Sequence, residues 1–457
     1  MSISSVPSTL AASAVAKAGR RLVWVLVLLY VINYLDRVNV GFAALRMNAD
    51  IGLSSTAYGL GAGLFFIGYF LFEVPSNLIM HRVGAKVWMA RIMISWGVLA
   101  CAMAFVQGPV SFYVLRVLLG VAEAGFFPGI VLYLTYWFPR AQRAKVMSLF
   151  MLGVPLASVL GAPISTLLIA HGAGWLGFAE GWRTMFFVEG LPAILMGFAA
   201  LVLMPSRPAN ARWLSAEQAE ALTATIDAED AQHVPEELGV LASLRHPRVV
   251  SLAAVYFGIV FGLYGLGFFL PQIVSGLQAQ FGVKFSIVQI GLVTAIPYAF
   301  GAVVMILNAR HSDRTGERVW HTAIPAFVGA AGVAIALYLG TPTLAVAALS
   351  VCTAGVLAAI PVFWQLPSAF LGGAGAAAGI ALINSFGNLS GFVGPFVTGA
   401  LNTATGSFRA GMWVIALAMA AAGVIALGVG RRIAAERADP AGSAAGSAAG
   451  SADSATG

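Results

Sequence analysis

The sequence predicts an all-α membrane protein with twelve transmembrane helices in two six-helix halves. Hydrophobic residues make up 60% of the 457-residue chain and charged residues only 9%, whereas soluble domains average about 25% charged residues. Apolar runs long enough to cross a bilayer, about 20 residues each, recur between charged and turn-forming residues. The chain also contains 52 glycines, which suits helices that pack closely in lipid.

The apolar runs fall into two sets separated by a polar segment. The first set is expected at residues 22–45, 57–79, 86–107, 111–137, 146–170 and 184–204. The second set is expected at residues 248–272, 287–308, 320–340, 343–364, 374–401 and 409–430. The sequence therefore predicts an N-terminal bundle at 22–204 and a C-terminal bundle at 248–430.

The remaining segments are polar. Residues 1–21 precede the first span, and a central loop at 205–247 separates the bundles. Residues 213–222 within this loop predict a short amphipathic surface helix capped by Ser215. Residues 431–457 contain Ala-Ala-Gly-Ser repeats and predict a disordered tail.

The distribution of basic residues predicts the orientation of the chain. Most of its 25 lysines and arginines fall in the terminal segments and in the loops expected on the same side. The loops of the opposite side carry only Arg46, Arg183, Lys284 and Arg409. Basic residues are enriched on the cytoplasmic side of membrane proteins, so we expect an inner-membrane protein with both termini in the cytoplasm. This distribution also accounts for the net charge of +7 without a nucleic-acid partner.

Ionisable residues at membrane depth usually belong to ion or substrate pathways, and here they are concentrated in the N-terminal half. They are Asp36, Arg37, Glu73, Arg116, Glu123 and Glu189. Arg116 and Glu123 are seven residues apart, which places them on nearly the same helix face. We expect them to share an interior cavity with Asp36 and Arg37.

Such a cavity provides a route to proton–anion coupling. A carboxylate held beside an arginine in a low-dielectric cavity can exchange a proton when an anionic substrate competes for the arginine. Structural ion pairs that fix helix packing are the alternative. We favour that alternative for Glu73, near the expected cytoplasmic end of its helix, and for Glu189, which can pair with Arg183.

The C-terminal half offers neutral polar and aromatic groups instead of charges. They are Tyr256, Tyr264, Gln272, Trp364, Gln365, Asn384 and Asn388. The two asparagines are four residues apart and share one helix face. These groups suit substrate hydroxyls or a ring, but hydrogen bonding between helices explains each of them equally well.

Other chemistries find no support in the sequence. No lysine belongs to a Gly-Lys-Ser/Thr phosphate loop, and the six histidines show no metal-ligand spacing. Cys101 and Cys352 lie in apolar stretches and are expected to be buried thiols. We therefore expect no enzymatic activity, no metal site and no cofactor.

Several motifs together resemble the anion:cation symporter branch of the major facilitator superfamily. In the N-terminal half they are Asn-Tyr-Leu-Asp-Arg-Val-Asn-Val-Gly-Phe-Ala at 33–43, Phe-Glu-Val-Pro-Ser-Asn at 72–77, Gly-Trp-Arg at 181–183 and Glu-Gly-Leu-Pro-Ala at 189–193. In the C-terminal half they are Arg-His-Ser-Asp-Arg-Thr-Gly-Glu-Arg at 310–318 and Ile-Asn-Ser-Phe-Gly-Asn-Leu-Ser-Gly-Phe-Val-Gly-Pro at 383–395.

The resemblance implies alternating access and import of small organic anions with protons; members of the branch carry sugar acids, tartrate, phthalate, nicotinate and hydroxyphenylacetate. It implies that Asp36 and Glu123 are the protonatable carboxylates, with Arg116 coupled to Glu123, and that Arg37 attracts the substrate carboxylate. The groups expected to line the substrate cavity are Tyr34, Tyr69, Tyr264, Trp364, Gln365, Asn384 and Asn388. The expected partners are a small organic anion, protons and the lipid bilayer, and the protein is expected to be a monomer.

Two departures from the branch matter. The loop at 77–86 contains Arg82 but no acidic residue of the usual Asp-Arg pair, although Asp313-Arg314 is present in the matching second-half loop. We expect these three residues to act in gating. Gly-Val-Pro-Leu at 153–156 lacks the polar side chain that some sugar-acid carriers present, which argues against a polyhydroxylated sugar acid.

The sequence thus predicts proton-coupled uptake of a small mono- or dicarboxylate. An exporter of drugs or metabolites is the main alternative, although the helix at 146–170 carries only Gly-Ala-Pro and not a fuller glycine-proline run. A non-transporting sensor is less favoured because no signalling domain is appended.

Overall fold

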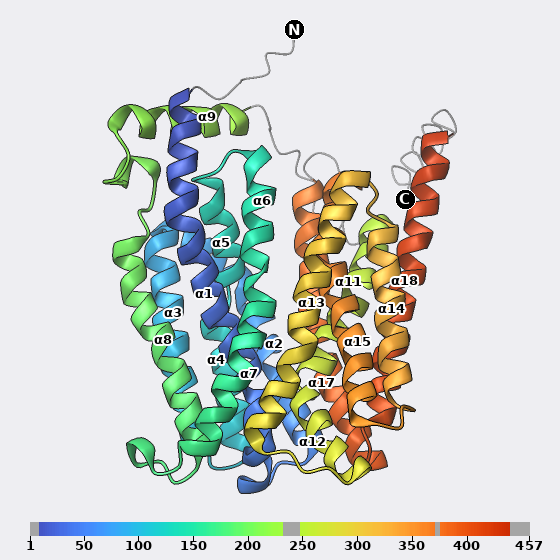
Figure 1. Cartoon of the computed structure of the whole chain (residues 1–457). Helices are drawn as coiled ribbons and strands as arrows, with labels where there is room; N and C mark the ends of the chain where they lie inside the picture. Colours follow the sequence, from blue (N-terminus) through green and yellow to red (C-terminus); the bar gives the residue numbers. More distant parts are fainter. Residues whose placement is uncertain (1–8, 232–246, 371–374, 439–457) are drawn as a thin grey trace, which may run out of the picture.

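The computed structural model describes residues 9–231, 247–370 and 375–438, which form helices and connecting turns without a strand. The helices form two bundles that stand side by side (Figure 1). Within the described residues, nine helices are long and apolar enough to cross a membrane. The helices α1 (Thr9–Asp50), α14 (Trp320–Ala336) and α17 (Gly375–Thr405) bring the total to the twelve that the sequence predicted.

The bounds of the helices show that some of the predicted spans are divided into two helices. The other helices of the first bundle are α2 (Ser55–Val83), α3 (Ala85–Ala102), α4 (Pro109–Glu123), α5 (Phe126–Thr135), α6 (Arg140–Met151), α7 (Gly153–His171) and α8 (Gly181–Leu203). The other helices of the second bundle are α11 (Pro247–Gly267), α12 (Leu270–Phe281), α13 (Ile287–Thr315), α15 (Pro342–Phe363), α16 (Gln365–Phe370) and α18 (Arg409–Ala438). The fourth and fifth spans are each built from two helices, α4 with α5 and α6 with α7.

Both ends of the described chain are more helical than predicted. Helix α1 begins at Thr9 and not near residue 22, and Ala11, Ala14 and Ala18 of its first turns are buried. Helix α18 continues to Ala438 instead of ending near residue 430, because residues 431–438 are mostly alanine and arginine, which favour helix. The predicted disordered tail is therefore wrong for residues 431–438, and residues 439–457 lie outside the described residues.

The predicted surface helix is confirmed as α9 (Ala216–Ala231), which lies across the end of α1 (Figure 1). The Ser215 hydroxyl accepts a hydrogen bond from the Gln218 backbone N–H at 3.2 Å, and the Gln218 side chain accepts one from the Ser215 N–H at 3.3 Å. This reciprocal pair is a capping box, and it confirms the predicted cap at Ser215. Lys17 Nζ of α1 also donates to Gln218 at 2.8 Å, so α9 is attached to the first bundle. Residues 232–246 of the central loop lie outside the described residues.

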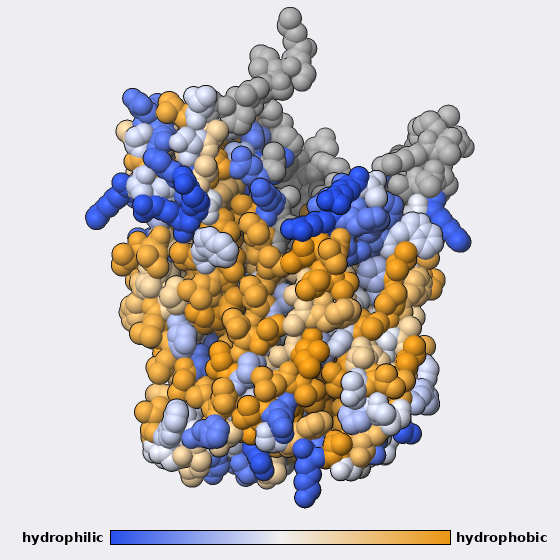
Figure 2. All heavy atoms as spheres, viewed as in Figure 1, coloured by the Kyte–Doolittle hydropathy of each residue, from blue (hydrophilic) through white to orange (hydrophobic). Residues whose placement is uncertain are grey.

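The surface has the polarity expected of a membrane protein. Figure 2 shows, on the face in view, a broad hydrophobic band between two more hydrophilic ends. Large apolar side chains such as Trp24, Leu195 and Val202 are well exposed. An exposed apolar band of this extent is stable against lipid and not against water.

The fourth span is interrupted at Ala124 and Gly125. Gly125 has φ +88°, and a Cβ at this position would lie 2.3 Å from the Ser76 hydroxyl of α2. That hydroxyl donates a hydrogen bond to the Ala124 carbonyl at 2.7 Å and accepts one from Trp88 Nε1 at 2.9 Å. The contact fixes the break directly after Glu123, the last residue of α4.

The two bundles meet closely on the side opposite the termini, where α1 ends and α2 begins. Tyr58 Oη donates to the Phe268 carbonyl at 2.9 Å, and Asn402 Nδ2 donates to the Ser55 hydroxyl at 2.7 Å. A Cβ on Gly59 would lie 2.3 Å from the Pro395 carbonyl oxygen, so only glycine allows α2 and α17 to approach this closely. Toward the termini the ribbons of the two bundles diverge (Figure 1).

Candidate functional site

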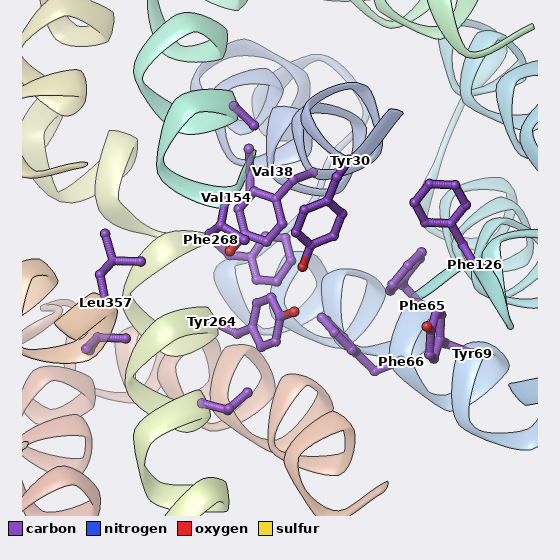
Figure 3. Close-up of a cluster of buried hydrophobic side chains, with 14 of the residues drawn as sticks. Tyr30, Val38, Phe65, Phe66, Tyr69, Phe126, Val154, Tyr264, Phe268 and Leu357 are labelled. Carbon is purple, nitrogen blue, oxygen red and sulfur yellow. The ribbon is translucent and has the colours of Figure 1, made fainter. Parts of the chain in front are cut away.

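A cavity lies between the two bundles and contains one guanidinium group, that of Arg37 on α1. Its polar and aromatic lining comes from both bundles and consists of Tyr30, Tyr34, Arg37, Tyr69, Phe127, Tyr256, Tyr264, Asn384 and Asn388. Among the residues that the structure describes, Arg37 is the one charged side chain in this lining. Figure 3 shows the hydroxyl groups of Tyr30 and Tyr264 directed into the same space between the helices.

Arg37 is held from three directions. It forms an ion pair with Glu123 at the end of α4. Its Nη1 donates to the Tyr264 hydroxyl of the second bundle at 3.2 Å. Its guanidinium carbon lies 5.2 Å from the Phe65 ring centroid and 5.5 Å from that of Tyr69, both on α2. Buried aromatic faces favour a cation at such distances, so the guanidinium is fixed at the cavity wall.

Helix α1 contributes three residues to the lining at a regular helical spacing. Tyr30, Tyr34 and Arg37 are related by four and three residues and therefore lie on one face of α1. The sequence-based prediction named Tyr34 and Arg37 but missed Tyr30, although the same spacing could have found it. Tyr30 stacks on Phe150 with ring centroids 4.1 Å apart.

The second bundle contributes aromatic and amide groups, as predicted for Tyr264, Asn384 and Asn388. Trp364 stands behind the lining, where its ring meets that of Tyr256 edge-on at 4.8 Å. Gln365 is half-buried at the start of α16 and is likewise not part of the lining. The expected direct contact of Trp364 and Gln365 with the cavity is therefore not seen.

Glu73 of α2 links the bundles beside the cavity. Asn384 Nδ2 donates to its Oε1 at 3.0 Å, and Asn388 Nδ2 donates to its Oε2 at 3.3 Å. The sequence-based interpretation of Glu73 as a packing residue near a helix end missed this contact, because nothing in the chain order indicates that α2 faces α17.

Arg116 does not pair with Glu123, contrary to expectation. Its Nε and Nη2 donate to the carbonyls of Gly61 and Ala62 at 3.3 and 3.0 Å, and its side chain is fully buried. Although Arg116 and Glu123 lie on one helix face, their spacing of seven residues separates them by about 10 Å along the helix axis. Glu123 pairs instead with Arg37 of another helix.

Asp36 also lies outside the cavity lining, contrary to expectation, because successive residues of a helix point about 100° apart. It accepts a hydrogen bond from Trp96 Nε1 at 2.7 Å and one from Asn39 Nδ2 at 3.4 Å. Asn39 also donates to Glu189 at 3.0 Å. Asp36 and Glu189 therefore belong to one buried network inside the first bundle.

The expected pairing of Glu189 with Arg183 is wrong. Ser165 donates to Glu189 at 2.7 Å, whereas Arg183 pairs with Glu180 at 2.7 Å. Arg183 is one helical turn from Glu180, so the local pair forms at the surface and leaves Glu189 inside the bundle.

The proposed gating residues lie near the side of the termini. Arg82 and Arg314 are exposed, and Asp313 pairs with Arg318 at 2.9 Å. Within the described residues, no group of histidine, cysteine, aspartate and glutamate side chains is placed to hold a metal ion. Cys101 and Cys352 are buried free thiols, as predicted.

The sequence profile described as Major Facilitator Superfamily matches residues 26–395. The chain belongs to the major facilitator superfamily. It is therefore a multi-pass membrane transporter, and the resemblance identified from its motifs is confirmed.

Superfamily members of different named function are similar to this chain. A putative tartrate transporter of Agrobacterium vitis is 50% identical over 412 residues, which cover 90% of each chain. A quinolone resistance transporter of Acinetobacter baumannii is 43% identical over 400 residues, which cover 87% of this chain and 91% of the relative. The inward-facing, occupied crystal structure of a bacterial homolog of the human lysosomal transporter Spinster superposes with a TM-score of 0.71 at 17% identity, covering 90% of this chain and 96% of that chain. This structural likeness confirms the fold.

Proposed function

We propose that this protein is a secondary transporter that imports a small organic carboxylate together with protons by alternating access. The observation that carries the proposal is the ion pair between Arg37, the cation of the central cavity, and Glu123. The name of the Agrobacterium vitis relative, a putative tartrate transporter, supports an organic anion as the substrate class.

The pair couples a proton to an anion through competition. A substrate carboxylate that binds Arg37 must displace the Glu123 carboxylate, and two carboxylates beside one guanidinium leave an uncompensated negative charge in a buried site. Protonation of Glu123 removes that charge and frees the guanidinium. Anion and proton therefore bind favourably together and unfavourably apart.

The proposed cycle also uses contacts between the bundles. Tyr264 of the second bundle bonds Arg37 of the first, so a substrate at Arg37 is contacted by both. The distribution of basic residues supports cytoplasmic termini and an inner-membrane location. On that orientation, the bundles are closed on the periplasmic side, and rocking of one bundle against the other would open it.

Asp36 is proposed as a second protonation site that acts from outside the cavity. It shares a buried network with the Glu189 carboxylate, and neither makes an ion pair within the described residues. Two nearby buried carboxylates without a cation favour binding of a proton between them.

The test is uptake of a panel of radiolabelled organic acids into proteoliposomes, with and without an inward proton gradient. Gradient-stimulated uptake of an acid should be lost in Glu123→Gln, while exchange of that acid across the membrane persists. Uptake that is indifferent to the gradient would contradict symport. The same assay with Asp36→Asn tests separately whether the Asp36 carboxylate is also required for gradient-stimulated uptake.

Export of drugs or metabolites in exchange for protons is the second candidate. It is supported by the name of the Acinetobacter baumannii relative and by the apolar part of the cavity lining. This candidate would come first if the protein, shown to be folded in liposomes, took up no acid of the panel and transported a fluoroquinolone in exchange for protons, driven by a proton gradient.

A further inference from the structure

The cavity has one cationic pole, at Arg37, and a neutral amide pole at Asn384 and Asn388. We infer that it takes an organic acid with a single carboxylate and an apolar or aromatic body, and that it discriminates against dicarboxylates. This inference rests on the proposed function, because it assigns the substrate carboxylate to Arg37.

The first argument is the number of charges available to a ligand. Within the described residues, Arg37 is the one charged side chain of the lining, and Glu123 already pairs with it. A single substrate carboxylate can replace Glu123 at the guanidinium once Glu123 is protonated. A second carboxylate on the same ligand finds no cation in the lining, and an unpaired charge in a buried site is strongly disfavoured.

The second argument is the direction of the hydrogen bonds at the other pole. Asn384 and Asn388 line the cavity, and both amide nitrogens donate to Glu73 behind them. Each amide nitrogen carries two N–H donors and Glu73 takes one of them, which leaves one N–H and the amide oxygen of each side chain for a ligand. A second ligand carboxylate would therefore meet neutral amides and no cation there, with the Glu73 carboxyl group behind them.

The third argument is the apolar wall of the cavity. The second bundle supplies Val260, Leu263, Met305, Leu357, Ile360 and Pro361 to the lining. A hydrocarbon chain or ring is stabilised when it buries its surface against such side chains. Tartrate carries a polar group on every carbon and has no apolar surface to place there. On the first bundle, Val154 lines the same cavity without a polar group.

The test is a competition experiment on the purified full-length protein in lipid nanodiscs at pH 7. Radiolabelled benzoate is bound at equilibrium and displaced by unlabelled benzoate, phthalate or tartrate. Phthalate has the same ring with one more carboxylate, so it isolates the effect of the second charge. We expect phthalate and tartrate to compete at least about tenfold more weakly than benzoate, a modest effect for an unpaired charge in a low-dielectric cavity. Equal or tighter binding of phthalate or tartrate would overturn the inference.

Glu73→Gln tests the amide pole directly, since it replaces the Glu73 carboxyl group by an uncharged hydrogen-bonding group of the same size. We expect the ratio of phthalate to benzoate inhibition constants to fall several-fold in this variant. The matched control is Glu180→Gln, the same substitution at a carboxylate of the first bundle that pairs with Arg183 and lies outside the cavity lining. It should leave the ratio unchanged. An unchanged ratio in Glu73→Gln would exclude Glu73 from the discrimination.

Failure of this inference is distinguishable from failure of the proposed function. Binding or uptake of acids without preference for a single carboxylate contradicts the inference alone. Absence of binding for benzoate, phthalate, tartrate and every acid of the uptake panel contradicts both.

Discussion

Arg37 and Arg116 are two buried arginines of one bundle with different surroundings. Arg37 faces the cavity and bonds side chains of α4 and α11, whereas Arg116 bonds two backbone carbonyls of α2. A lysine has the charge of arginine but not its planar set of donors, so it cannot hold Tyr264 and both oxygens of a substrate carboxylate together.

We therefore expect Arg37→Lys to weaken binding of a transported acid by at least about tenfold, or 1.4 kcal/mol, with little change in melting temperature. Arg116→Lys is the matched control and should lower the melting temperature while the folded protein keeps its affinity. Equilibrium binding and thermal unfolding of the detergent-solubilised variants measure both effects. The reverse pattern would show that Arg116, and not Arg37, binds the anion.

The Tyr264 hydroxyl joins Arg37 to the second bundle and can be removed alone. Tyr264→Phe keeps the ring that packs on Phe66, with centroids 4.5 Å apart, and loses only the hydrogen bond. We expect affinity to fall by about 0.5–1.5 kcal/mol, the usual net contribution of one hydrogen bond. Binding that is unchanged within error would mean that the contact contributes nothing to the occupied site.

At the scale of the element, the break between α4 and α5 depends on Gly125. An alanine there would have to adopt a left-handed conformation and place its Cβ against the Ser76 hydroxyl. We expect Gly125→Ala to destabilise the protein by about 1–3 kcal/mol and to displace Glu123 from Arg37.

Gly316→Ala is the matched control for Gly125→Ala. Gly316 also has a left-handed conformation, with φ 69° and ψ 2°, but a Cβ there would meet no atom within 4 Å. Thermal unfolding should show a smaller loss for Gly316→Ala, since it carries similar backbone strain without a steric clash. Equal losses in the two variants would mean that the contact with Ser76 does not matter.

The positions of the membrane-spanning helices were predictable from the sequence, because they follow from the length of the apolar runs. The spans at 57–79 and 409–430 fall within α2 and α18 because a membrane-spanning helix must satisfy its own backbone groups. Tyr34 and Arg37 were predicted as cavity residues from the family motif at 33–43, and both lie in the lining. The partner of Glu123 was not, because Arg37 reaches it from another helix, and neither was the contact of Glu73 with α17.

At the scale of the whole molecule, the closed side opposite the termini provides a test of alternating access. Ser55 of α2 and Asn402 of α17 join the bundles there through a 2.7 Å hydrogen bond. A disulfide between cysteines at these positions should hold the bundles in the present arrangement and stop transport. The native Cys101 and Cys352 are buried and would be replaced by alanine.

We expect oxidised Ser55→Cys/Asn402→Cys protein to lose acid uptake in proteoliposomes and to recover it when the disulfide is reduced. The two single-cysteine variants, oxidised in the same way, should remain active. Full uptake by the crosslinked protein would contradict the proposal that the bundles separate on this side.

The attachment of α9 to the first bundle has a practical consequence for labelling the protein. Trp213, just before α9, stacks on Trp137 with centroids 5.4 Å apart, and Lys17 bonds Gln218. A fluorophore on the exposed side of α9 would therefore travel with the first bundle. A second fluorophore beyond Arg431 would report on the other bundle, and energy transfer between the two dyes could follow single turnovers without altering the cavity.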